Sequence, residues 1–185
     1  MARVESKMID LGSEAPDFFL PEVRNNEKIG LYDVLGGHGL LVMFISRHCT
    51  FVQHIKKQIT QLSTEYLEKG IRFVAISAND VVNYPDDHPK KLAEMAEEEG
   101  WKFPFLFDES QDVARSYEAT CTPDFFLYDK KARLVYRGQL DGSRPGNDVP
   151  NDGKDLRSAM DALIKGHKIN LDQRPSIGCN IKWND

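Results

Sequence analysis

The sequence predicts an α/β protein whose mixed central sheet carries helices on both faces. Three observations predict it. Residues 39–45 and 71–77 are almost wholly apolar, as expected of strands that are covered on both sides. Each is followed by a segment with helical spacing, as in parallel strands joined by helical crossovers. Residues 125–128 and 133–139 are two extended segments around a short polar turn, which indicates an antiparallel hairpin.

The elements before the first buried strand are short. Residues 1–16 are polar and expected to be irregular. Residues 16–21 read as a strand bounded by prolines, hence at a sheet edge, and residues 28–30 as its neighbour. Residues 31–35 have room for one helical turn before Gly36 and Gly37.

Helices are indicated by apolar residues at helical spacing. The longest is expected between Cys49 and Lys69, because Gly70 is a natural stop. Its apolar positions are Val52, Ile55, Ile59, Leu62 and Tyr66. Three shorter segments are expected to be helical: 89–99, 111–117 and 154–165. The segments between them read as polar loops at 79–87 and 141–153 and a short apolar strand at 103–108.

Length and composition favour one domain over residues 1–185, with a C-terminal tail at 167–185 packed on it. Hydrophobic residues make up 41% and charged residues 29%, as in ordinary globular proteins. A net charge of −5 argues against nucleic acid or an anionic membrane as partner. The N-terminus has no apolar core typical of a secretory signal, and the longest apolar run is too short to cross a bilayer. We therefore expect a cytoplasmic protein.

The three cysteines, Cys49, Cys121 and Cys179, are sparse and contain no C-x-x-C pair, which argues against a disulfide framework or a zinc site. His48 and His54 are six residues apart and so face different sides of a helix. We expect neither a metal nor a cofactor.

Ser46-Arg47-His48-Cys49 is the most informative stretch. It lies where a buried strand is expected to end and a helix to begin. The unpaired N–H groups and positive dipole end of a helix stabilise a thiolate, the reactive form of cysteine. A protonated His48 would act in the same direction. The Ser46 hydroxyl is either a catalytic group or a helix cap.

Four motifs in the same order resemble the redoxin group of the thioredoxin superfamily, the AhpC/TSA or peroxiredoxin-like family. The resemblance spans nearly the whole chain and is closest to a branch with C-N-H-C-P at the strand–helix turn. That branch also has A-N-D, C-T-P-D-F-F-L and P-S-I-G-C-x-I-K-W further on. The matching segments here are Ser46 to Thr50, Ala78 to Asp80, Cys121 to Leu127 and Pro175 to Trp183. The resemblance implies a thioredoxin-like fold with an N-terminal β-hairpin extension, a helical insertion and the C-terminal tail.

The departures from the family fall on the reactive centre. Ser46 replaces the first cysteine of C-x-x-C, and a serine hydroxyl cannot form a disulfide, so a self-contained C-x-x-C enzyme is excluded. Ser46-x-x-Cys49 matches the hydroxyl and thiol of a peroxidase centre. However, Val42 stands where peroxidases have proline, and the stretch after Cys121 lacks their arginine.

The resemblance also assigns roles around Cys49. Thr122-Pro123 resembles the cis-proline turn beside the active site of the superfamily, and it brings Cys121 close to Cys49. Cys121 is therefore the expected resolving thiol, with a Cys49–Cys121 disulfide left open. Cys179 is expected to pack the tail onto the domain, with a resolving role as the alternative.

Our first hypothesis is a thiol-dependent oxidoreductase with Cys49 as reactive thiolate and Cys121 as resolving thiol. Its pocket would be shaped by Ser46, His48, Thr122 and Pro123. Its partners would be a peroxide or protein disulfide as substrate and thioredoxin or a small thiol as reductant. The alternatives are an antioxidant thiol peroxidase and a redox-inactive module that binds an extended peptide, and a homodimer is left open.

Aspartates near this site read as ordinary surface groups. Asp80 is expected in a solvated loop, and the acidic residues Asp86, Asp87 and 97–99 on a solvated face.

Overall fold

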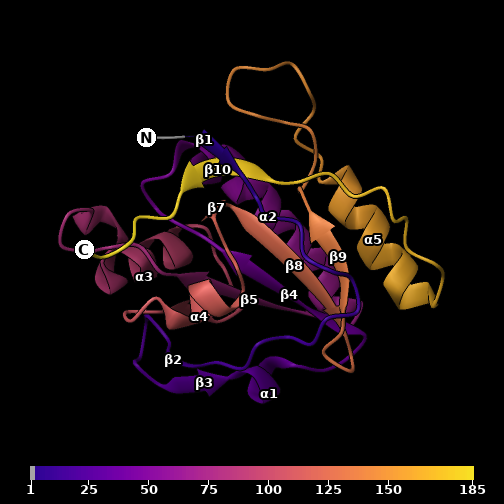
Figure 1. Ribbon diagram of the computed structural model, residues 1–185, viewed down its shortest axis with the longest axis horizontal. Coiled ribbons are helices and arrows are strands. Elements are labelled where there is room, and N and C mark those ends of the chain that lie inside the picture. Colours follow the sequence, from indigo (N-terminus) through magenta and orange to yellow (C-terminus); the bar gives the residue numbers. More distant parts are fainter. Residues whose placement is uncertain (1–2) are drawn as a thin grey trace.

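The computed structural model describes residues 3–185, and its central layer is a five-stranded sheet in the order β6-β5-β4-β8-β9 (Figure 1). Its strands are β4 (Gly39–Phe44), β5 (Ile71–Ser77), β6 (Phe105–Phe107), β8 (Asp124–Asp129) and β9 (Leu134–Gly138). β4, β5 and β6 run parallel to one another, whereas β8 is antiparallel to both β4 and β9. The predicted mixed sheet and its hairpin are confirmed.

The helices begin and end within one residue of the predicted limits. They are α1 (Leu31–Val34), α2 (Thr50–Glu68), α3 (Pro89–Glu98), α4 (Asp112–Ser116) and α5 (Lys154–Lys165). A 3-10 turn at Pro85–Asp87 lies within the predicted loop before α3. Gly70 and Gly166 directly follow α2 and α5 with φ of +86° and +65°, the left-handed conformation that favours glycine at helix ends.

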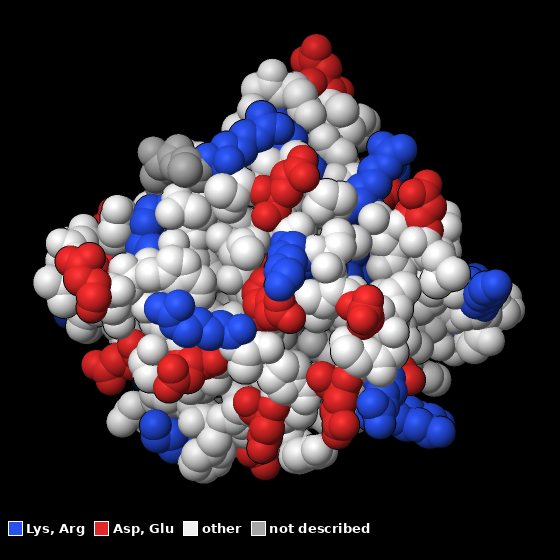
Figure 2. Space-filling view, viewed as in Figure 1, with Lys and Arg blue, Asp and Glu red and all other residues white. Residues whose placement is uncertain are grey.

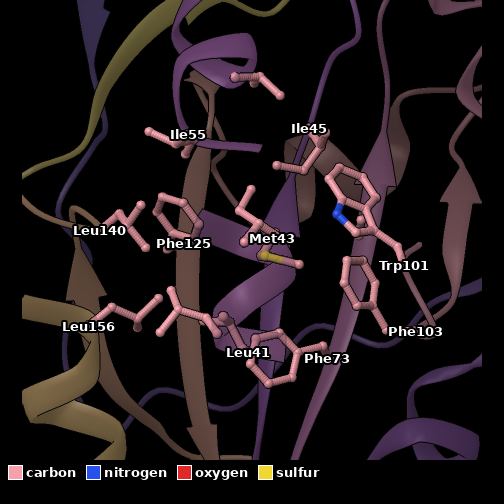
Figure 3. Close-up of a cluster of buried hydrophobic side chains, with 14 of the residues drawn as sticks. Leu41, Met43, Ile45, Ile55, Phe73, Trp101, Phe103, Phe125, Leu140 and Leu156 are labelled. Carbon is pink, nitrogen blue, oxygen red and sulfur yellow. The ribbon is translucent and has the colours of Figure 1, made fainter. Parts of the chain in front are cut away.

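The sheet separates two apolar cores, because successive residues of a strand point to opposite faces. Leu41, Met43 and Ile45 face a core built with α2, α3 and α5 (Figure 3). Leu40 and Phe44 face the second core, which includes residues of α1, α4 and the segment before β2. A hairpin of β2 (Phe19–Pro21) and β3 (Lys28–Gly30) borders that side, as the predicted N-terminal extension.

A separate small sheet joins the two ends of the described chain. It has the order β1 (Arg3–Glu5), β10 (Ile177–Asn180) and β7 (Cys121–Thr122), with both pairs antiparallel. The prediction that residues 1–16 are irregular is therefore wrong for 3–5, because these residues gain a strand partner at the far end of the sequence; residues 1 and 2 lie outside the described part. Residues before and after β10 anchor it too, since Ser6 and Ser176 bond to each other and the Ile181 N–H donates to the Thr120 carbonyl.

Charged side chains of both signs are interspersed over the face in Figure 2, without a broad area of one sign. Within residues 3–185, no helix combines the length and the apolar character needed to cross a membrane.

Candidate active site

Cys49 occupies the N-cap position of α2, at the end of the turn that leads out of β4. Its backbone is extended, with φ −74° and ψ 120°, and its side chain is fully buried within the core on the α2 side of the sheet. An N-cap side chain lies against the unpaired N–H groups of the first helical turn. Cys49 thus lies at the start of a helix, as the sequence predicts.

The surroundings of Cys49 lower its thiol pKa to about 6. The largest cause is a hydrogen bond with the thiol of Cys179. Burial opposes ionisation, but the Thr122 side chain and the backbone N–H groups of Val52 and Cys179 add to the lowering. These groups therefore favour the thiolate form of Cys49, although the side chain is buried.

Cys179 lies on strand β10, which brings it close to Cys49. Cys179 lies opposite Thr122 in the β10–β7 pairing, and the Cys49 thiol, when protonated, donates to the Thr122 carbonyl at 3.1 Å. A Cβ on Gly178 would lie 1.9 Å from that same carbonyl, so the close approach of β10 to β7 requires glycine at this position. The pKa of Cys179 is raised by its hydrogen bond to Cys49 and by burial, so Cys179 is the protonated partner.

Cys121 is in a different environment, although it precedes the cis peptide bond Thr122–Pro123. Residues 121 and 122 point to opposite faces of β7, and Cys121 lies near the buried pair Asp124–Arg137 rather than beside Cys179. Burial, and then the charge of Asp124, raise its pKa far above the ordinary range. All three cysteines are free thiols. Of the two candidate partners of Cys49, Cys179 is brought close to it by the pairing of β10 with β7 through Thr122, whereas Cys121 lies near Asp124.

Ser46 and His48 both bind a residue that the sequence analysis assigned to a solvated surface. Asp87 is fully buried, and its carboxylate accepts hydrogen bonds from the Ser46 hydroxyl at 2.9 Å and from His48 Nδ1 at 2.5 Å. Ser46 is neither the N-cap of α2 nor hydrogen-bonded to Cys49. The expectation for Asp87 is wrong because the turn at residues 85–87 folds back onto residues 46–48, a contact between distant segments. No local sequence pattern distinguishes Asp87 from the exposed Asp86.

The remaining charged groups near the turn point elsewhere. The Arg47 guanidinium bonds the Lys91 carbonyl and the Glu94 carboxylate of α3. His54 pairs with the Ser143 hydroxyl at 2.6 Å, away from the partners of His48. Across residues 3–185, no group of three or more histidine, cysteine or acidic side chains is arranged to hold a metal ion.

Comparisons with known proteins agree with this architecture. The AhpC/TSA family model matches residues 11–137. A crystal structure of an uncharacterised conserved protein from Geobacillus kaustophilus is 46% identical with a TM-score of 0.97, covering 100% of this chain and 97% of that one. The thiol-disulfide oxidoreductase ResA of Bacillus anthracis is 27% identical over 71% of this chain and 70% of its own length.

A third likeness concerns the fold alone. The thioredoxin domain of a thiol-disulfide oxidoreductase from Bacteroides vulgatus has a TM-score of 0.61 at 18% identity, covering 81% of this chain and 97% of that domain. The predicted thioredoxin-like fold is therefore confirmed. With a family model matching most of the chain and a cysteine at the start of α2 in a thioredoxin-like fold, the chain belongs to the AhpC/TSA family.

Proposed function

We propose that this protein is a thiol-disulfide oxidoreductase whose redox pair is Cys49 and Cys179. The observation that carries the proposal is that both cysteines meet at Thr122: the Cys49 sulfur lies 3.1 Å from the Thr122 carbonyl, and Cys179 is opposite Thr122 in the β10–β7 pairing. The pKa of Cys49 is lowered there and that of Cys179 is raised. Such a pair supplies an attacking thiolate and a protonated resolving thiol at neutral pH. The relatives named thiol-disulfide oxidoreductase support the same reaction class.

The reaction is thiol–disulfide exchange in two steps. The Cys49 thiolate attacks one sulfur of a substrate disulfide, forms a mixed disulfide and releases the other sulfur as a thiolate. Cys179 then loses its proton, attacks the Cys49 sulfur and releases the second substrate sulfur as a thiolate. The protein gains a Cys49–Cys179 disulfide, and the substrate disulfide is reduced to two thiols. An external dithiol such as thioredoxin, or a small thiol, reverses these steps on the protein.

Access to the pair depends on β10. Cys49 is 0% and Cys179 3% exposed, so a substrate disulfide reaches Cys49 only when β10 separates from β7. The segment 177–180 is short and lies between the anchors at Ser176 and Ile181, so we infer a local opening in which β10 leaves β7 while paired with β1.

The other two hypotheses from the sequence have less support. A peroxidase would need the Ser46 hydroxyl to orient a peroxide, but that hydroxyl donates to Asp87. A peptide-binding module would need the free edge of β7, which β10 already occupies. The cytoplasmic location and the single-domain organisation stay predictions.

The test is oxidation by one equivalent of hydroxyethyl disulfide, followed by mapping of the disulfides by mass spectrometry. We expect a Cys49–Cys179 disulfide in the wild type and in Cys121→Ala, and a mixed disulfide held at Cys49 in Cys179→Ala. A Cys49–Cys121 disulfide, or no modification of Cys49, would contradict the proposal.

A further inference from the structure

Asp87 is linked to both segments that carry the redox thiols, directly to the turn 46–48 and through Asn79 to the end of β10. On one side, its carboxylate accepts from the Ser46 hydroxyl and from the Arg47 backbone N–H at 2.5 Å, within the turn directly before Cys49. On the other side, Asn79 donates to Asp87 at 2.8 Å and accepts from the backbone N–H of Lys182 at 2.8 Å. Lys182 follows β10 and is three positions from Cys179.

An aromatic stack joins the same two segments. The imidazole of His48 bonds Asp87 through Nδ1 and stacks on the Tyr84 ring, with centroids 5.2 Å apart and an interplanar angle of 20°. The ammonium group of Lys182 lies 5.5 Å from the centroid of the same ring. The Asp80 N–H donates to the Lys182 carbonyl. Asn79 and Asp80 together therefore bind both the N–H and the C=O of Lys182.

A fully buried carboxylate needs several donors to stay ionised. Burial of Asp87 opposes ionisation, but hydrogen bonds from His48, Asn79 and Ser46 hold its pKa below the ordinary value. Donors of the turn 46–48 and of Asn79 thus compensate the charge of Asp87. The same hydrogen bonds hold each of these donors in place.

We propose that Asp87 is the positioning residue of the redox pair: its carboxylate holds the turn 46–48 directly and the end of β10 through Asn79, so that Cys49 and Cys179 stay in register. This inference rests on the proposed function, because it names what aligns the two thiols. Asp87 does not touch the reacting sulfurs and acts only through these neighbours.

The test compares Asp87→Asn with Asp86→Asn, which removes the same charge from the exposed neighbouring position. An amide has the shape of the carboxylate but cannot accept all the donors that meet there. In Asp87→Asn we expect the Cys49 pKa to rise by about one unit, which lowers the thiolate fraction about twofold at pH 7 and about tenfold only well below pH 6. The fraction of Cys49–Cys179 disulfide in a fixed mixture of reduced and oxidised glutathione should fall as well. Asp86→Asn should behave as the wild type.

The sign of the change distinguishes positioning from simple electrostatics. Removing a negative charge near a thiolate by itself lowers the thiol pKa, whereas loss of alignment with Cys179 raises it. A fall in the Cys49 pKa, or a result equal to that of Asp86→Asn, would overturn the inference. If Asp87→Asn does not fold, Asn79→Ala removes the bridge to Lys182 together with one donor to Asp87, and leaves the bonds of Asp87 to the turn 46–48 in place. It should still lower the disulfide fraction; an unchanged fraction contradicts the inference.

The two proposals fail in different ways. If the wild-type protein forms no Cys49–Cys179 disulfide, the proposed function is contradicted, whatever the variants do. If the wild type forms the disulfide and Asp87→Asn has no effect, only the positioning role of Asp87 is contradicted.

Discussion

Cys49 and Cys121 are both fully buried, yet their environments shift their pKa values in opposite directions. Cys49 starts a long helix and has the Cys179 thiol as a hydrogen-bond partner, so its pKa falls to about 6. Cys121 lies near the carboxylate of Asp124, and burial dominates, so its pKa rises. Burial therefore does not decide whether a cysteine is inert; the donors and charges around the sulfur do.

The two environments also differ in what holds them together. Asp124 and Arg137 form a fully buried, two-pronged ion pair, with the Arg137 guanidinium also over the Phe126 ring at 3.9 Å. Cys179 instead reaches the place of Cys49 on the short strand β10. We infer that the Asp124–Arg137 pair keeps the surroundings of Cys121 rigid, and that β10 covers Cys49 and opens locally.

The largest expected effect concerns the rigid side. Arg137→Met would leave Asp124 buried without its partner, at a cost of about 3–5 kcal/mol. Urea unfolding measures this cost, and Asp124→Asn combined with Arg137→Met should recover part of it. The lowered pKa of Cys49 should persist in the folded variant. Loss of that lowering would show that the environments of Cys49 and Cys121 are not independent.

Cys179→Ala removes the largest cause of the low Cys49 pKa. A hydrogen bond to a charged group contributes about 1.5–3 kcal/mol, so the Cys49 pKa should rise by roughly one to two units. Thiolate absorbance against pH measures it, with Cys121→Ala as the matched control. A Cys49 titration unchanged in Cys179→Ala would mean that the helix start alone suffices.

Gly178→Ala tests whether β10 covers the thiolate. Because the new Cβ meets the Thr122 carbonyl, β10 should shift away from β7, at a cost of about 1–3 kcal/mol. We expect faster alkylation of Cys49 by iodoacetamide, with Cys121 still protected. Equal protection of Cys49 in variant and wild type would contradict the covering role.

The lowered Cys49 pKa also predicts a dependence of stability on pH. Its folded pKa is about 6 and its ordinary value 9.0, so its contribution to stability is fully present above pH 9 and is lost as pH falls toward 6. The difference in unfolding free energy between wild type and Cys49→Ala should rise with pH in this window, by up to about 1.4 kcal/mol per unit. A flat or falling difference would refute the pKa assignment.

Local patterns were enough to predict most of the fold. The spacing of Val52, Ile55 and Ile59 and the stop at Gly70 predict α2, and the position of Cys49 at its start follows. The short strand β1 could not be predicted, since the three residues Arg3 to Glu5 become a strand only by pairing with β10.

The site was predictable only in part for the same reason. Cys49 and the Thr122–Pro123 turn carry recognisable motifs. Cys179 and Asp87 depend on contacts between distant segments: the register of β10 against β7, and a turn folded onto residues 46–48. A buried aspartate and an exposed one look alike in sequence when only tertiary contacts separate them.

The most direct test of the account is a pH titration of thiolate absorbance in the wild type, Cys49→Ser and Cys121→Ala. We expect a transition near pH 6 that disappears in Cys49→Ser and is unchanged in Cys121→Ala. A first transition near the ordinary cysteine pKa of 9.0, or one that disappears in Cys121→Ala instead, would contradict this expectation.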